Sequence, residues 1–226
     1  MTATSAVSAT NALATFEIGA DGICQPMGKA PSSLRRFRLR RPYRLYRFLS
    51  DLDDLVDTVK SDRERLRIAA VLVRHLLSET SWIAEACLPP DPDLGWSVNY
   101  LYDEPGYPFT IQSVSWMPGE SSPVHNHATW SIVAIVGDET SGQEENTFWT
   151  REDKGDREGY AEVVQTGQRI LKPGDILTLM PAAIHSVKAV SPDDNPQPTR
   201  TFNVYGLTDL ERRLEFDPAT QTCKTF

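Results

Sequence analysis

The stretch "PGESSPVHNHATWSIVAIVGDE", residues 118–139, decides the fold, because it joins two histidines to a strand pattern. His125 and His127 are two of only four histidines in the chain. Side chains two positions apart on a strand point to the same face, so both imidazoles should project together while Asn126 points away. Two imidazoles on one face form two corners of a metal site. The stretch therefore predicts a metal centre on a strand.

A second stretch, "KPGDILTLMPAAIH" (172–185), supplies a third ligand. It predicts a strand that ends at Pro181, a short turn, and a new strand that begins at His185. In a barrel, residues far apart in the chain can face one lumen. The alternative is a pair of surface histidines near a loop. The two stretches together favour His125, His127 and His185 as one ligand set.

The region 95–226 reads as a series of short strands. Its segments are rich in β-branched and aromatic residues and are bounded by Gly, Pro, Asp or Asn, as in "WSVNYLY" (96–102) and "RTFNVYG" (200–206). Many short strands at this spacing are typical of a β-sandwich or β-barrel. We therefore expect a mainly β domain over residues 95–226.

The region 34–94 is expected to form a helical layer of the same domain. Apolar residues recur at helical spacing in 43–59, and Ser61 or Asp62 offers an N-cap for the helical pattern that follows. Residues 1–33 are rich in Ala, Ser, Thr and Gly and are expected to be a disordered leader. They lack the basic and apolar regions of a signal peptide, so none is expected.

Composition excludes several classes of function. The net charge of −8 argues against general nucleic-acid binding, and no apolar run approaches the roughly 20 residues that span a membrane. The cysteines are few, odd in number and widely spaced, which favours free thiols and a reducing, cytoplasmic compartment. They are Cys24, Cys87 and Cys223.

One segment departs from the acidic composition. Residues 35–47 carry seven arginines and no acid, and without them the remaining 16 basic residues face 31 acidic ones, a net charge of −15. This arm could touch a membrane surface, RNA or an acidic partner, or it could pack on the acidic body of the protein itself.

At this point the chain resembles a known family. The stretches 118–139 and 172–185 are similar to the two motifs of the cupins, and "SVSWMPGESSPVHNHATW" (113–130), "TFNVYG" (201–206) and "FDPATQTCKTF" (216–226) resemble the bacterial cysteine and 3-mercaptopropionate dioxygenases. The resemblance implies a cupin jelly-roll barrel that holds one Fe²⁺ by three neutral histidines. Such enzymes add both atoms of O₂ to a small thiol and release a sulfinate. It also implies a monomer or small homo-oligomer.

The resemblance also implies further site residues. Many cupins carry a glutamate ligand four or five positions after the second histidine, but here Ser131 and Ile132 stand there. Thiol dioxygenases carry a Ser-x-His-x-Tyr relay, which matches Thr201, Asn203 and Tyr205, our candidate catalytic residues. Asn203 can hydrogen-bond but cannot shuttle a proton near neutral pH. Thr201 and Asn203 could instead be satisfied polar groups of the barrel wall.

The residue that anchors a substrate carboxylate differs between the two branches of this family. Cysteine dioxygenases use an arginine on an early strand, and Asn99 lies near that position here. The 3-mercaptopropionate branch has paired arginines after its Tyr-Gly, which match Arg212 and Arg213. We expect Arg213 to bind the carboxylate, with Asn99 a second substrate-binding candidate. The alternative for Arg213 is a solvated or salt-bridged surface arginine.

Three functions remain open from the sequence. The first is an iron(II) dioxygenase whose partners are a small-molecule thiol and O₂, with no nucleic acid and no membrane. The second is a cupin-fold iron oxygenase that acts on a non-thiol molecule, favoured by the loss of the relay histidine and of the early arginine. The third is a non-catalytic cupin that binds a metal or small ligand.

Overall fold

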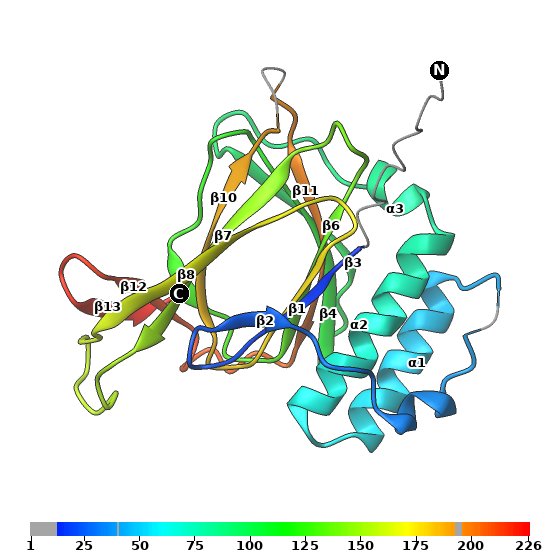
Figure 1. Cartoon of the computed structure of the whole chain (residues 1–226), viewed down its shortest axis with the longest axis horizontal. Coiled ribbons are helices and arrows are strands. Elements are labelled where there is room, and N and C mark those ends of the chain that lie inside the picture. Colours follow the sequence, from blue (N-terminus) through cyan, green and yellow to red (C-terminus); the bar gives the residue numbers. More distant parts are fainter. Residues whose placement is uncertain (1–12, 40, 193–195) are drawn as a thin grey trace, which may run out of the picture.

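The computed structural model describes residues 13–39, 41–192 and 196–226. Within these residues two sheets of mainly antiparallel strands face one another and form a barrel, whose interior we call the lumen (Figure 1). One sheet has seven strands in the order β2-β1-β9-β6-β11-β4-β3, and the other has six in the order β13-β12-β5-β10-β7-β8. This arrangement confirms the predicted fold class, a mainly β jelly-roll barrel with an N-terminal helical layer.

The strands of the seven-stranded sheet are β1 (Thr15–Ile18), β2 (Cys24–Pro26), β3 (Trp96–Tyr102), β4 (Phe109–Trp116), β6 (Ser131–Val136), β9 (Ile176–Leu179) and β11 (Thr199–Gly206). Those of the six-stranded sheet are β5 (Val124–Asn126), β7 (Gln143–Arg151), β8 (Val163–Leu171), β10 (Ile184–Val190), β12 (Leu214–Asp217) and β13 (Thr222–Thr225). Many neighbouring strands are not consecutive in the chain, such as β1 beside β9 and β5 beside β10, so the sheets join segments far apart in the sequence.

Helices cover the outer face of the seven-stranded sheet (Figure 1). They are the short 3₁₀ helix η1 (Ser32–Arg36) and the helices α1 (Leu45–Thr58), α2 (Asp62–Glu79) and α3 (Trp82–Glu85). The predicted cap of α2 is present, since the side chain of Ser61 accepts a hydrogen bond from the amide of Glu64 at 3.5 Å. This bond satisfies one of the free amides at the start of the helix.

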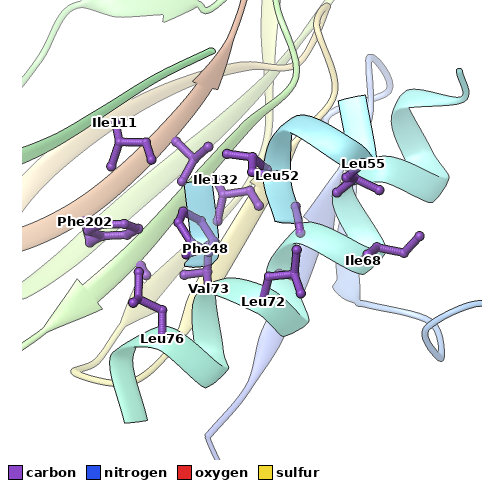
Figure 2. Close-up of a cluster of buried hydrophobic side chains, with 14 of the residues drawn as sticks. Phe48, Leu52, Leu55, Ile68, Leu72, Val73, Leu76, Ile111, Ile132 and Phe202 are labelled. Atoms are coloured by element: carbon purple, nitrogen blue, oxygen red, sulfur yellow. The ribbon is translucent and has the colours of Figure 1, made fainter. Parts of the chain in front are cut away.

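The helices and the sheet share one hydrophobic core (Figure 2). Phe48 of α1 and Leu72 of α2 point toward Ile132 and Phe202 of the sheet, and all four side chains are fully buried. The rings of Phe48 and Phe202 meet edge to face, with 6.1 Å between their centres. Burial of these side chains is what ties the helical layer to the barrel.

We expect Phe48→Ala to lower the free energy of unfolding by about 3–5 kcal/mol, because it leaves a cavity between helix and sheet. Chemical denaturation of the full chain measures this change. Tyr46→Ala on the same helix is the control, since Tyr46 is exposed, and it should change stability by less than about 0.5 kcal/mol. Equal effects of the two substitutions would contradict the shared core.

The structure corrects the expected disordered leader. Residues 1–12 lie outside the described residues, but β1 and β2 form strands within 1–33. β1 pairs in parallel with β9, and Arg74 of α2 donates to the carbonyl of Ala14 at 2.8 Å and to the hydroxyl of Thr15 at 2.7 Å. The small polar composition concealed this segment because its pairing partner lies about 160 residues later.

The strand predictions for 95–226 hold in most places. The predicted segments 96–102 and 200–206 match β3 and β11. The short strand β5 lies where the histidine pair predicted a strand, but β12 and β13 were not predicted as strands, because they carry polar residues. Strands this short give little periodic signal.

The structure also bears on the cysteines, on the arginine-rich segment 35–47 and on membrane-spanning helices. Cys24, Cys87 and Cys223 are free. In the arginine-rich segment, Arg41 pairs with Glu79 and Arg47 with Asp51, each at 2.8 Å. Arg40 lies outside the described residues. No helix in the described part of the chain is both long and apolar enough to cross a membrane.

Candidate metal centre

Two neighbouring strands of the six-stranded sheet position the three histidines. His125 lies on β5 directly opposite His185 on β10, so both imidazoles leave the sheet on the lumen side. His127 follows the end of β5, and Ala128 after it adopts a left-handed conformation with φ of 53°. This turn leads the chain from the six-stranded sheet into β6 and directs His127 toward the other two rings. The predicted ligand set therefore comes together, with His127 placed by the turn that follows β5 rather than by alternation along the strand.

The three imidazoles converge on one point in the barrel. Nε2 of His127 lies 3.2 Å from Nε2 of His125 and 3.2 Å from Nε2 of His185. All three side chains are buried, with exposed fractions of 7%, 6% and 2% for His125, His127 and His185. Nitrogen atoms this close can all reach one ion at the bond length of about 2.1 Å typical of imidazole–metal bonds.

The outer ring nitrogens are engaged in hydrogen bonds. Nδ1 of His125 lies 3.0 Å from the carbonyl oxygen of Pro123, and Nδ1 of His185 lies 2.9 Å from Oδ1 of Asn146. Both partners only accept, so these rings carry their proton on Nδ1 and present a lone pair at Nε2. Nδ1 of His127 contacts the hydroxyl of Ser131 at 2.5 Å.

The Nε2 atoms of His125 and His185 therefore carry no proton where they face Nε2 of His127. Lone pairs held together at this distance in a dry pocket repel one another unless a cation lies between them. The donor set fits a divalent transition metal that accepts imidazole, and it contains no carboxylate. The residues present thus fit the metal that the sequence predicts.

Burial lowers the pKa of all three histidines. The pKa of His125 falls to about 4, and those of His127 and His185 fall well below their ordinary value, with burial the largest cause in each case. Desolvation disfavours the charged imidazolium. The neighbouring rings and the charge of Arg213 lower the pKa of His127 further. At neutral pH the rings are therefore neutral and ready to bind a metal without losing a proton.

We expect the metal-free protein to lose stability as the pH falls from about 6.5 toward 4. A histidine whose folded pKa is lowered binds its proton more tightly in the unfolded chain, so acid favours unfolding. A pKa of about 4 for His125 corresponds to a loss of about 2 kcal/mol between pH 7 and pH 5. Chemical denaturation of the wild type and His125→Gln at both pH values measures this. A variant with the wild-type pH dependence would contradict the assignment.

A cavity of about 210 Å³ opens beside the histidines. His127 forms part of its wall, so a molecule in the cavity would lie next to the metal centre. The other lining residues come from strands of the seven-stranded sheet, from Asp103 just after β3, and from the segment after β11. They include Tyr100, Gln112, Tyr205, Thr208 and Arg213. A volume of this size suits a small polar molecule rather than a large one.

Arg213, the predicted carboxylate-binding residue, lines this cavity, and the backbone on both sides of it is held by hydrogen bonds. The side chain of Asn126, the residue between the first two histidines, accepts from the amide of Leu214 at 2.7 Å and donates to the carbonyl of Arg212 at 3.1 Å. The guanidinium of Arg213 lies 4.4 Å from the ring centre of Phe226. That ring in turn stacks on His125 at 5.0 Å. The cation is therefore placed by residues that also touch the metal centre.

Thr201, Asn203 and Tyr205 face the lumen together, as their alternation on β11 predicts. Tyr205 packs edge to face on His127, with 5.0 Å between the rings. Burial, followed by the charge of Glu144, raises the pKa of Tyr205 to about 12, so its phenol is protonated at neutral pH. The amide nitrogen of Asn203 donates to the hydroxyl of Thr201 at 3.0 Å. Of these three residues, only Tyr205 lines the cavity.

The structure corrects the substrate-binding prediction for Asn99. Its side chain points to the outer face of β3 and donates to the carbonyl of Ala86 at 3.0 Å. The next residue, Tyr100, faces the lumen instead, opposite Gln112 of β4. Side chains alternate along a strand, so counting one position off moves a residue to the other side of the sheet.

The sequence reasoning missed the groups that surround the histidines. Ser131, Asn146 and Asn126 each bind a ligand histidine or the segment of Arg213, and Glu144 binds Asn146. Two of these residues could have been recognised from the strand pattern of the sequence. Asn146 and Glu144 are polar residues at two-residue spacing with the apolar Phe148, so they share the face of β7 that buries Phe148.

No protein-family model matches the chain. Among solved structures, it is similar to a cupin superfamily protein from Desulfitobacterium hafniense, with a TM-score of 0.35 and 14% identity over 49% of this chain and 76% of that one. It is also similar to a cupin-2 domain from Rhodospirillum rubrum, with a TM-score of 0.40 and 12% identity over 55% and 68%.

A third similar structure is an oxalate oxidase in complex with the substrate analogue glycolate, with a TM-score of 0.37 and 16% identity. That similarity covers 51% of this chain and 52% of the oxidase. Because these TM-scores lie below 0.5, we base the functional proposal on the residues of the site. By its own strand order the chain is a barrel of two facing sheets, and it holds three inward histidines.

Proposed function

We propose that this protein is a mononuclear non-heme iron(II) dioxygenase that adds O₂ to a small thiol and yields the sulfinate. The observation that carries the proposal is the buried set of three neutral histidines without a carboxylate, beside a small cavity that contains an arginine and a protonated tyrosine. Both oxygen atoms join the sulfur, so that RSH and O₂ together give RSO₂H. Ferrous iron in the site would supply the redox chemistry of this step.

The histidines contribute in two ways, because they are neutral and because there are three of them. Because all three are neutral, they leave the full charge of a divalent ion to favour the thiolate form of a substrate. Three protein ligands also leave room for small molecules at the same ion. The burial of His127 and His185 keeps bulk water away from this point.

Arg213 and Tyr205 act on the substrate from the cavity wall. A guanidinium can bind a carboxylate through two parallel hydrogen bonds, so Arg213 would hold a carboxylated thiol with its sulfur toward the histidines. The phenol of Tyr205, protonated at neutral pH, can donate a hydrogen bond next to His127. Thr201 and Asn203 lie behind Tyr205 on the same strand and have a supporting role.

The direct test reconstitutes the metal-free protein with Fe²⁺ and follows O₂ uptake with cysteine, 3-mercaptopropionate, cysteamine and mercaptosuccinate. We expect at least one thiol to give stoichiometric sulfinate, identified by mass spectrometry. The protein without iron is the control. Iron-loaded protein that yields no sulfinate from any of these thiols would refute the thiol reaction.

A second candidate is an iron oxygenase of the same fold that acts on a non-thiol molecule. Two observations favour it: Asn203 stands in the relay position, and Tyr100 and Gln112 occupy the wall where Asn99 was expected. O₂ uptake with dicarbonyls, amino acids or aromatic acids, and none with thiols, would select this candidate. Metal binding without any turnover would select a non-catalytic metal-binding protein.

A further inference from the structure

A buried carboxyl group, that of Glu144, is linked to the metal centre through a single side chain, that of Asn146. Glu144 and Asn146 point into the lumen from the same face of β7, with exposed fractions of 3% and 0%. Nδ2 of Asn146 donates to Oε1 of Glu144 at 2.8 Å, and Oδ1 of Asn146 lies 2.9 Å from Nδ1 of His185. The three side chains form a chain of hydrogen bonds that leads from Glu144 to a metal ligand.

Each donor and acceptor in this series of hydrogen bonds is fixed when Glu144 is ionised. A carboxylate only accepts hydrogen bonds, so it holds the amide nitrogen of Asn146 toward itself and the amide oxygen toward His185. The amide oxygen then accepts the Nδ1 proton of His185. This leaves the Nε2 lone pair free for the metal. A reversed amide would favour the other tautomer of His185, whose Nε2 carries a proton and cannot bind a metal.

Glu144 forms no ion pair within the described residues. The residues opposite it on β10 and β8 are Ala189 and Leu171. Two other charged or titratable groups face this region. They are the Tyr205 phenol on β11, and Arg169 on β8, whose guanidinium lies 4.2 Å from the ring centre of Phe16.

Burial accordingly raises the pKa of Glu144 to about 7, and the hydrogen bond from Asn146 opposes this rise only in part. An isolated buried carboxylate is costly. A divalent ion between the histidines would add positive charge at the far end of this hydrogen-bond series, so it would favour ionised Glu144. By linkage, ionised Glu144 favours the bound ion to the same degree.

We propose that Glu144 and Asn146 are positioning residues that hold His185 in its metal-binding tautomer and supply a buried negative charge that strengthens metal binding. The inference rests on the metal site of the proposed function but not on its thiol chemistry. Hydrogen-bond partners behind metal-bound histidines commonly change metal affinity by about 10–100-fold when they are removed.

The test measures Co²⁺ binding to the metal-free full-length protein by calorimetry and by the visible spectrum of the bound ion. We expect Glu144→Gln to lower the affinity about tenfold at pH 8. Near pH 6 the gap should shrink, because Glu144 of the wild type is then largely protonated and neutral as well. Asn146→Ala should lower the affinity by at least about tenfold at both pH values, because it breaks the link to His185.

The matched control is Glu145→Gln, the next residue on β7, whose side chain points outward and binds Gln168. Its affinity for Co²⁺ should equal that of the wild type. Thermal unfolding of the metal-free variants shows that they fold, and Glu144→Gln should unfold at or above the wild-type temperature at pH 8, because it removes a buried charge. Equal affinities of the Glu144 and Glu145 variants at pH 8, or an equal loss at both pH values, would overturn the proposal. Because only the metal is used, a failed thiol assay would not affect the result.

Discussion

His185→Ala is expected to lower the affinity for Co²⁺ or Fe²⁺ by at least about 100-fold. Each tenfold loss corresponds to about 1.4 kcal/mol of binding free energy. The substitution removes one of three ligands and leaves Oδ1 of Asn146 without its partner in a buried place. Calorimetry measures the affinity, and metal content after anaerobic reconstitution with Fe²⁺ and dialysis measures retention. The metal-dependent rise in unfolding temperature should disappear with it.

His75→Gln is the matched control for this loss. His75 lies on α2, where its ring packs 4.7 Å from that of Tyr43 in the helical layer. This variant should bind metal as the wild type does. A His185→Ala protein that is folded and still binds with wild-type affinity would contradict the three-histidine centre.

Arg213→Leu is expected to raise KM for a carboxylated thiol, such as 3-mercaptopropionate, about 10–100-fold. The reason is the loss of a charge-assisted, two-point contact with the carboxylate. With cysteamine, which has no carboxylate, KM should change little, so the ratio of the two effects reports the role of the guanidinium. Steady-state O₂ uptake with both thiols gives the measurement.

Arg212→Leu provides the control, because Arg212 is the exposed neighbour and only its backbone carbonyl is bound by Asn126. It should leave both KM values near those of the wild type. If Arg213→Leu left KM unchanged for both thiols, or raised it equally for both, Arg213 would not be the carboxylate anchor. The alternative of a surface arginine would then stand.

The metal ligands were predictable because they depend on local geometry. His125 lies on β5 and His127 directly follows it, and the second motif places His185 near the start of another strand. The amphipathic pattern of α1 and α2 was equally local, and both helices form close to where the pattern indicates. Such features need only the chain near them.

The prediction for Asn99 failed for the opposite reason. Its position was inferred by comparison over a region without a strong motif, and a single step along β3 exchanges the two faces of the sheet. Tyr100 therefore occupies the cavity wall and Asn99 binds the backbone near α3. β1 was missed because its polar, glycine-containing neighbourhood becomes a strand only through β9, which completes its hydrogen bonds.

The sequence by itself determined the barrel, the helical layer and the three histidines, because hydrophobic periodicity and strand alternation act within short segments. Only the tertiary structure decided what surrounds those histidines. Asn146 reaches His185 across 39 residues, and Asn126 holds the segment of Arg213 across more than 80. Such contacts depend on which strands become neighbours and in what register. That choice comes from burying side chains and pairing backbone groups over the whole chain at once.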